Sequence, residues 1–403
     1  MPAASAQAPL PSALDASLLA TLAAACGVFV ASIYFNQPLL ELLLQAFPHD
    51  AAIVNLIPTA TQLGFACGLL LLVPLGDRVN RRHLILCQSA GLCLALAGLS
   101  LAPAAWSAAL ISVCVGIGGS VAQQIVPLAA ELAHPQRRGQ VVGTVMSGLL
   151  CGILLGRVVG GFAGEHWGWR AAFGLGAAAC ALMWLILLVK LPSTRPQTTH
   201  RYGELMRSLR GLWRSEPQLR RATRVQALLF GAFIGMWTIL ALYLDQAFGL
   251  GADVAGLMGV VGAAGILMAP LAGRIADRRG PHSVIALGVF IMLVSFVILG
   301  AWASLIGLVV GILLVDIGEQ AAMIANQHVV YALRPEARSR LNTLYMTGMF
   351  LGAAAGSWGA GLAWHAGGWK LACLLWGVLC ALAWLVHARG RPAPAPATGR
   401  HTG

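Results

Sequence analysis

Long apolar runs recur along the whole chain and are separated by short polar segments. Each run is long enough for a helix that crosses a bilayer, which takes about 20 residues. We expect helix because a segment in lipid must satisfy its own backbone hydrogen bonds, and barrel strands are shorter and alternate in polarity. The pattern predicts an all-α polytopic membrane protein with twelve transmembrane helices, over residues 18–40, 52–75, 83–101, 105–130, 141–164, 171–191, 223–245, 251–273, 282–302, 304–330, 341–364 and 370–388.

Composition narrows the class of protein further. Of the 403 residues, 58% are hydrophobic and only 10% are charged, whereas a soluble domain carries about 25% charged residues. A soluble enzyme, a disordered chain and a secreted disulfide scaffold are therefore excluded. The nine cysteines lie in the apolar runs without a CxxC pair, which indicates free thiols that pack as small hydrophobes.

The net charge of +12 is distributed unevenly along the chain. Arginines gather after every second apolar run, whereas the alternate loops hold only Arg170 and Lys370 as basic residues. The positive-inside rule then predicts that both termini and the Arg-rich loops are cytoplasmic. The charge is thus a topology signal: we expect a multi-pass protein of the bacterial inner membrane, in contact with the lipid bilayer and with no nucleic-acid partner.

The sequence also repeats itself at a spacing of 200 residues. Asp77-Arg78 superimposes on Asp277-Arg278, and Arg138 superimposes on Arg338. Two six-helix bundles in the same orientation are therefore predicted, which is a known transporter architecture. The expected organisation is a cytoplasmic N-terminal segment (1–17), an N-terminal bundle (18–191), a cytoplasmic loop with an amphipathic helix (192–222), a C-terminal bundle (223–388) and a disordered cytoplasmic tail (389–403). An unstructured tether is the alternative for the loop.

Three motifs carry a resemblance to a known family. The loop after the second run reads LGDRVNRR over residues 75–82, and its counterpart reads GRIADRRG over residues 273–280. Glu131 precedes Arg138-Gly139 by the family's spacing, and the fifth run has a glycine pattern in which Arg157 replaces a proline. The chain resembles the major facilitator superfamily over nearly its whole length. The combination of Asn36-Gln37-Pro38, the segment PLGDR over residues 74–78, Arg157 and Asn326-Gln327 is similar to its bacterial drug/sugar-efflux-like, proton-antiporter branch. Ser112, however, stands where that family's drug–proton antiporters usually carry an arginine.

The resemblance implies two structural devices. Paired charges at the cytoplasmic ends would form a conformational latch between the bundles; simple inside-positive anchors are the alternative. The latch residues are Asp77, Arg78, Arg81, Glu131, Arg138, Asp277, Arg278 and Arg338. Glycines at every fourth position allow close helix approach, and in this family such spans form the seam between the bundles. The seam residues are Gly148, Gly152, Gly156, Gly160, Gly348, Gly352 and Gly356.

Three charges remain well inside the apolar runs. A charge at the centre of a membrane helix costs about 2.5–3.5 kcal/mol on insertion scales, so each needs a reason. Arg157 lies in the fifth run, and Asp316 and Glu319 lie one helical turn apart in the tenth. We expect Arg157 to approach Asp316 across the cavity or its seam, with the acid serving as the proton-coupling group. A purely structural ion pair and a contact with a substrate charge are the alternatives.

Neutral polar residues lie in the first, fourth, seventh and tenth runs, which line the central cavity in this family. Amide side chains both donate and accept hydrogen bonds, so they suit a polar solute; interhelical hydrogen bonds are the alternative. The expected cavity residues are Asn36, Gln37, Gln123, Gln124, Trp237, Thr238, Gln320, Asn326 and Gln327.

These features together predict a secondary transporter that works by alternating access and exports a small organic solute in exchange for protons. A proton-coupled importer or an uncoupled facilitator on the same fold is the second interpretation, and a membrane sensor or membrane enzyme is the third. The sequence contains no G-x-x-x-x-G-K-[ST] loop, so ATP would not drive transport directly. We expect a monomer without enzymatic activity, cofactor or metal site.

Overall fold

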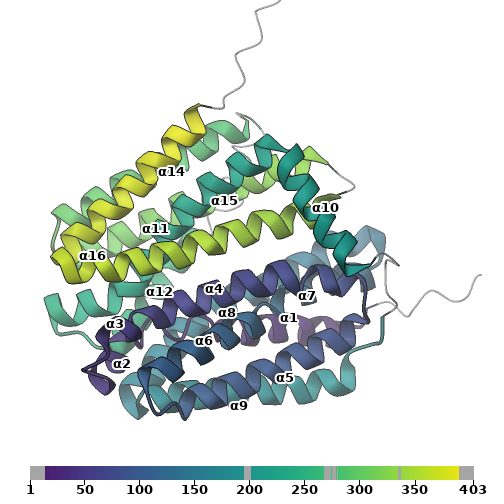
Figure 1. The fold of residues 1–403 in the computed structure, drawn as a ribbon, viewed down its shortest axis with the longest axis horizontal. Helices are drawn as coiled ribbons and strands as arrows, with labels where there is room; N and C mark the ends of the chain where they lie inside the picture. Colours follow the sequence, from purple (N-terminus) through teal and green to yellow (C-terminus); the bar gives the residue numbers. More distant parts are fainter. Residues whose placement is uncertain are drawn as a thin grey trace, which may run out of the picture.

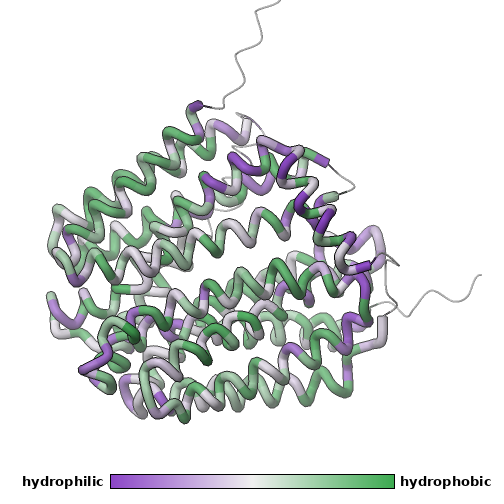
Figure 2. The backbone as a smooth tube through the Cα atoms, in the orientation of Figure 1, coloured by the Kyte–Doolittle hydropathy of each residue, from purple (hydrophilic) through white to green (hydrophobic). Residues whose placement is uncertain are grey.

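The computed structural model describes residues 14–194, 201–266, 280–334 and 337–389, together with Arg274 and Arg278. Throughout these residues the regular structure is helix, with no strand. Hydrophobic residues cover the helices along their length, while hydrophilic residues gather toward their ends (Figure 2). The all-α membrane architecture predicted from the apolar runs is confirmed.

The helices fall into two groups that follow the chain (Figure 1). The first half contains α1 (Ala16–Ala31), α2 (Leu40–Ala46), α3 (Ala51–Val54), α4 (Leu56–Leu71), α5 (Arg81–Ser100), α6 (Ala105–Gly119), α7 (Ala122–Leu132), α8 (Arg138–Trp167) and α9 (Trp169–Lys190). The second half contains α11 (Pro217–Phe248), α12 (Ala252–Ile266), α14 (Pro281–Ala301), α15 (Leu305–Leu333) and α16 (Arg338–Ala388). Helix α10 (Tyr202–Ser215) follows the first half and precedes the second.

Nine helical stretches within the described residues are long and apolar enough to cross a membrane. One of them, α16, contains two apolar runs, because Gly367 and Gly368 interrupt its helical backbone and Gly368 adopts a positive φ of 64°. The shorter apolar helices α1 and α12 supply the remaining two runs. The structure is therefore consistent with the predicted count of twelve.

Helix boundaries differ from the sequence prediction most clearly at α1 and α11. Helix α1 ends at Ala31, and the chain continues through turns over residues 32–39 before α2 begins. Pro38, which has no backbone N–H to donate, lies in this break,. Helix α11 begins at Pro217, inside the segment predicted as a loop, because a proline at the first helical position is well tolerated.

The two ends of the molecule are distinct. Helix α10 lies at one end, here called the α10 end, whereas α2 and α3 lie at the opposite or far end (Figure 1). The halves contact each other through α4 with α16, α8 with α12, and α2 with α11. Helix α10 packs on α11 and α16, and the Tyr202 hydroxyl donates to the Leu71 carbonyl of the first half at 2.9 Å.

The structure corrects the expected placement of the glycine faces. On α8 the glycines approach the first segment of the same half: Gly148 meets Ala23, Gly152 meets Gly27, Gly156 meets Ala31, and Gly160 meets Phe35. On α16 they approach α11: Gly348 meets Thr223, Gly352 meets Ala227, and Gly356 meets Gly231. These seven glycines therefore permit close packing within each half rather than across the seam. Across the seam the close approach is made by Gly161 against Ala252 and by Gly256 against Arg157.

This packing repeats as the sequence does. Ala23, Gly27 and Ala31 lie 200 positions before Thr223, Ala227 and Gly231, the residues that contact the matching glycines of the second half. The sequence repeat therefore corresponds to a helix–helix contact that occurs in both halves.

Candidate functional site

A cavity of about 370 Å³ lies between the two halves. Its wall includes Gln123 of α7, Arg157 of α8, Gly262 of α12 and Asp316 of α15. It extends toward the α10 end, where Tyr331 at the end of α15 and Asn342 at the start of α16 belong to the wall. Much of the remaining lining is aromatic or thioether: Tyr34, Phe65, Met146, Phe230, Phe233, Met323, Met346, Met349 and Phe350.

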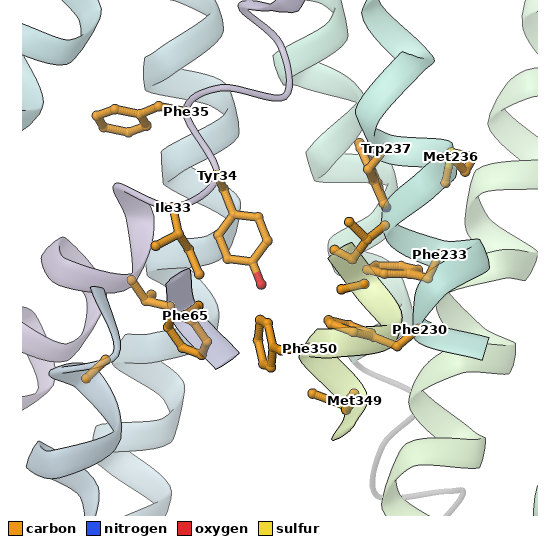
Figure 3. Close-up of a cluster of buried hydrophobic side chains, with 14 of the residues drawn as sticks. Ile33, Tyr34, Phe35, Phe65, Phe230, Phe233, Met236, Trp237, Met349 and Phe350 are labelled. Carbon is orange, nitrogen blue, oxygen red and sulfur yellow. The ribbon is translucent and has the colours of Figure 1, made fainter. Parts of the chain in front are cut away.

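Aromatic rings connect one half to the other across this cavity (Figure 3). The Phe65 ring of α4 lies 4.3 Å, centroid to centroid, from the Phe350 ring of α16. Phe350 packs on Phe230 at 5.3 Å, and Phe230 stacks on Phe233 at 5.6 Å. Tyr34 faces this group from the first half, with its oxygen directed into the space between the two walls (Figure 3).

Arg157 is held by neutral and aromatic groups. Its Nε donates to Gln37 Oε1 at 2.9 Å, and its guanidinium lies 3.9 Å from the Trp237 ring and 5.0 Å from the Tyr34 ring. Cation–π contacts of this kind contribute about 2 kcal/mol when they are desolvated. Only 4% of Arg157 is exposed, so these contacts fix the position of a buried charge.

The expected direct contact between Arg157 and Asp316 is not formed. Both residues line the same cavity, yet no ion pair joins them among the described residues. Arg157 instead donates through Nε to Gln37 and lies over the Trp237 ring. The expected approach of the two residues to one cavity is thus seen without a direct ion pair, because the Arg157 guanidinium contacts amide and aromatic partners.

The two carboxylates of α15 have different surroundings. Glu319 accepts a hydrogen bond from Gln226 Nε2 at 2.8 Å, and Gln226 Oε1 accepts one from Asn326 Nδ2 at 3.1 Å. Asp316 lies one turn away and is 6% exposed, and its Oδ2 has no hydrogen-bond partner among the described residues. Glu319 is therefore hydrogen-bonded to α11, whereas no ion pair or hydrogen bond holds the Asp316 carboxylate among the described residues.

The neutral polar residues separate into lining and packing groups. Gln123, Gln320 and Gln327 line the cavity as expected. Gln37 and Trp237 instead contact Arg157 beside it. The other four form interhelical or local bonds: Asn36 donates to Thr61, Gln124 donates to the Leu72 carbonyl, Thr238 donates to Ser357, and Asn326 donates to Gln226.

Charges of the first half gather on Arg81 at the α10 end. Arg81 is 5% exposed and lies 2.5 Å from Asp77 and 3.6 Å from Glu131. Arg78 and Arg138, also expected in the latch, are exposed. The ion pairs formed here among the described residues are thus Asp77–Arg81–Glu131, within the first half, while Arg340 of α16 acts on Asp77 electrostatically from the second half.

The second half is arranged differently at this end. Arg334 pairs with Glu216 at 2.6 Å, and Arg338 Nε donates to the Tyr331 backbone carbonyl at 3.1 Å. Tyr331 stands where the first half has Glu131. Arg278 is exposed, and Asp277 lies outside the described residues, so the second copy of the motif is not placed.

Side-chain hydrogen bonds between the halves lie at the far end, at residues that the sequence analysis did not single out. Glu165 of α8 accepts the Ala252 N–H of α12 at 2.9 Å. Asn55 lies 2.6 Å from the His365 ring, and the Thr59 and Ser357 hydroxyls lie 3.3 Å apart. Single polar residues at helix ends resemble ordinary interface residues, so no sequence pattern singled them out.

Gln226 is the other residue that sequence reasoning missed. It follows an Arg-rich segment near the start of α11, where a glutamine predicts a polar boundary. In the structure it is fully buried between Glu319 and Asn326. Within the described residues no group of three His, Cys, Asp or Glu is placed to bind a metal ion.

Comparison with known proteins places this architecture in a family. The model of the Major Facilitator Superfamily matches residues 18–300 and 225–403. The uncharacterized transporter YgaY of Escherichia coli O157:H7 is 40% identical over 384 residues, covering 94% of this chain and 96% of the relative. The multidrug resistance protein MdtG of Klebsiella pneumoniae is 28% identical over 224 residues, which is 54% of each chain.

Solved structures agree on the fold. A bacterial homologue of the human lysosomal transporter Spinster, in an inward-facing and unoccupied conformation, superimposes with a TM-score of 0.76. The alignment covers 94% of this chain and 98% of that structure at 15% sequence identity. The family match over nearly the whole chain, the close relative and the shared helical architecture lead to one assignment. The chain belongs to the Major Facilitator Superfamily of membrane transporters.

Proposed function

We propose that this transporter exports a small, largely apolar organic solute from the bacterial cytoplasm in exchange for protons. The observation that carries the proposal is Asp316: a carboxylate in the cavity wall, 6% exposed, with no ion pair among the described residues. Such a carboxylate in an apolar site is stabilised by a proton or by a cationic group of a ligand. One group can therefore bind either of the two exchanged species.

Several features support the direction of this exchange. The arginine distribution assigns the α10 end to the cytoplasm,. The cavity extends toward that end, while the far end is closed by Gly161 against Ala252 and by Glu165. The proposed resting state therefore admits solute from the cytoplasm. An inner-negative potential then favours proton entry by about 2.3 kcal/mol per charge for each 100 mV.

Asp316, Glu319 and Arg157 would have different roles in the transport cycle. Solute enters between the aromatic walls and displaces the proton of Asp316, the halves rock to open the far end, and a proton from outside then displaces the solute. Glu319 keeps its bond to Gln226 and orients α15 against α11. Arg157 remains beside Gln37 and Trp237, so it does not neutralise Asp316 permanently.

Resemblance adds weaker support for export. MdtG is named for multidrug resistance and matches about half of this chain. The apolar and aromatic lining fits a lipophilic solute better than a sugar, since ligand pockets combine apolar walls with a few placed polar groups. The proposed substrate class is therefore an amphipathic organic molecule.

The proposal is tested in proteoliposomes by the effect of an imposed proton gradient on solute accumulation. Drugs, sugars and amino acids are offered to the wild-type protein and to the Asp316→Asn variant. Asp245→Asn is the matched control, because Asp245 is an exposed carboxylate of α11 outside the cavity.

We expect gradient-driven accumulation by wild type and control and its loss in Asp316→Asn. Gradient-driven transport that is unchanged in Asp316→Asn would remove the coupling role from this residue. Transport that ignores the gradient in all three proteins would identify a facilitator instead.

A further inference from the structure

We propose that the transported solute is a zwitterion with an apolar body, whose anionic group binds Arg157 and whose cationic group binds Asp316. This inference rests on the proposed function only in assuming that the central cavity carries the solute. It goes further by assigning the chemical class of that solute and a separate recognition role to each of the two charges.

The first observation concerns the unused bonding capacity of Arg157. A guanidinium has five N–H donors, yet Nε donates to Gln37 and the terminal Nη2 has no acceptor among the described residues. Tyr34 and Trp237 contact the group through the faces of their rings. A planar cation that is fixed in place and left with free edge donors is suited to a carboxylate, which pairs with arginine through two parallel hydrogen bonds.

The second observation is that Asp316 also lacks a hydrogen-bond partner. Its Oδ2 is buried and has no donor among the described residues. Leaving a buried polar atom unsatisfied costs about 1–3 kcal/mol, and more when the group is charged. Because Glu319 already receives the Gln226 amide, Asp316 is the carboxylate of this pair that is available to an ammonium group.

The geometry keeps the two charges apart and yet within reach of one ligand. An added Cβ at Gly259 would lie 3.4 Å from the Arg157 side chain, and one at Gly262 would lie 2.9 Å from the Asp316 carboxylate oxygens. These glycines are three residues apart on α12, which is an axial rise of about 4.5 Å. Arg157 and Asp316 thus lie on different halves at nearby depths, without an ion pair between them.

The aromatic part of the cavity wall indicates that the uncharged part of the solute is apolar. Phe65, Phe230, Phe233 and Phe350 form an apolar surface beside the two charges. A cavity of about 370 Å³ is in the range of small-molecule sites. A solute with one positive charge, one negative charge and an aromatic or branched body satisfies all three surfaces, whereas a simple cation or anion leaves one buried charge unpaired.

The test compares three solutes that share one phenyl body. L-phenylalanine carries both charges, 2-phenylethylamine carries only the positive charge, and 3-phenylpropionate carries only the negative charge. Binding to the purified full-length protein is measured by calorimetry at neutral pH. We expect the zwitterion to bind at least about tenfold more tightly than either relative, the equivalent of about 1.4 kcal/mol for the extra charge-assisted contact.

Two variants separate recognition from folding. Arg157→Gln should remove the preference for L-phenylalanine over 2-phenylethylamine and keep its preference over 3-phenylpropionate; Asp316→Asn should do the reverse. Arg170→Gln is the matched control, because Arg170 also stacks on a tryptophan, Trp169 at 4.2 Å, but lies outside the cavity wall. A variant that fails to fold would lose all three ligands alike, and the other variant then decides the outcome.

The inference would be overturned if the wild type bound either single-charge solute as tightly as L-phenylalanine. It would also be overturned if L-phenylalanine did not bind at millimolar concentration. A different failure belongs to the proposed function. If L-phenylalanine binds with the expected preference but moves without protons, the zwitterion site stands and the antiport mechanism does not.

Discussion

The two ends of the molecule are held by different kinds of interaction. At the α10 end, strong charge pairs such as Asp77–Arg81 and Glu216–Arg334 are confined to one half or to its adjoining helix. At the far end the halves meet through the close approach of Gly161 to Ala252 and a few hydrogen bonds. The strongest contacts thus hold each half together, while weaker ones close the far end. This division suits a protein whose halves must separate repeatedly without unfolding.

The largest effect should follow from blocking the close approach at the far end. In Gly161→Leu the new side chain would meet the Ala252 backbone carbonyl, which cannot move aside easily. Overpacking costs about 1–3 kcal/mol, so we expect roughly a tenfold to hundredfold shift away from the state that is open at the α10 end. A cysteine introduced by Gln327→Cys into a variant whose nine native cysteines are replaced reports this shift when it is labelled from either face of oriented vesicles by an impermeant maleimide.

The control for this prediction is Gly174→Leu, because an added Cβ at Gly174 meets no atom within 4 Å. Labelling of the Gln327 position from the α10 side should fall in Gly161→Leu and stay unchanged in the control. Unchanged labelling in both variants would show that Gly161 does not hold the far end closed.

Breaking the buried charge network around Arg81 should lower the stability of the first half, without shifting the equilibrium between the two conformations. Arg81→Gln leaves Asp77 and Glu131 without their shared cation, which should lower the free energy of unfolding by about 1–3 kcal/mol. Arg334→Gln removes an arginine that is 44% exposed, so its cost should stay within about 1 kcal/mol. Thermal unfolding compares the two, and equal losses would refute the distinction between them.

A smaller change is expected at the carboxylate that caps α12. Glu165→Ala removes the acceptor of the Ala252 N–H and the negative charge at a helix N-terminus, an interaction that contributes about 0.3–1 kcal/mol at an exposed site. The maleimide assay should show a shift of a few fold toward the far-end-open state. Glu165→Gln keeps an acceptor and should shift less; a larger shift in Glu165→Gln than in Glu165→Ala would contradict this role.

The smallest effect should come from the paired hydroxyls. Thr59→Val preserves shape and removes the 3.3 Å contact with Ser357. Hydrogen bonds between membrane helices contribute about 0.6 kcal/mol on average, so labelling should change by less than about threefold. A change as large as that of Gly161→Leu would reverse the expected ranking of packing over hydrogen bonding.

Sequence alone predicted the fold well because apolar length is a local property. The runs located the membrane helices, and the spacing of Leu205, Leu209 and Trp213 predicted α10, in which Leu209 and Leu212 are buried. The break after Ala31 was missed, since residues 32–39 are apolar enough to continue a helix. The early start of α11 was missed because its first turns are rich in arginine.

The site was predicted less completely because its contacts are long-range. The sequence identified Arg157, Asp316 and Glu319 as unusual charges, and all three line the cavity. It could not identify Gln37 and Trp237 as the partners of Arg157, which are 120 and 80 positions away. A glycine face likewise shows that some helix approaches closely, but only the structure shows that the neighbour of α8 is α1.

The most direct test of the proposed exchange is to record the internal pH of proteoliposomes when a solute is added outside. A panel that contains L-phenylalanine and lipophilic drugs is suited to this measurement, with Asp316→Asn vesicles as the reference. Antiport predicts that solute entry makes the interior more alkaline in wild-type vesicles and leaves the pH of the variant unchanged. Solute entry with acidification of the interior, or with no change of pH, would contradict the account.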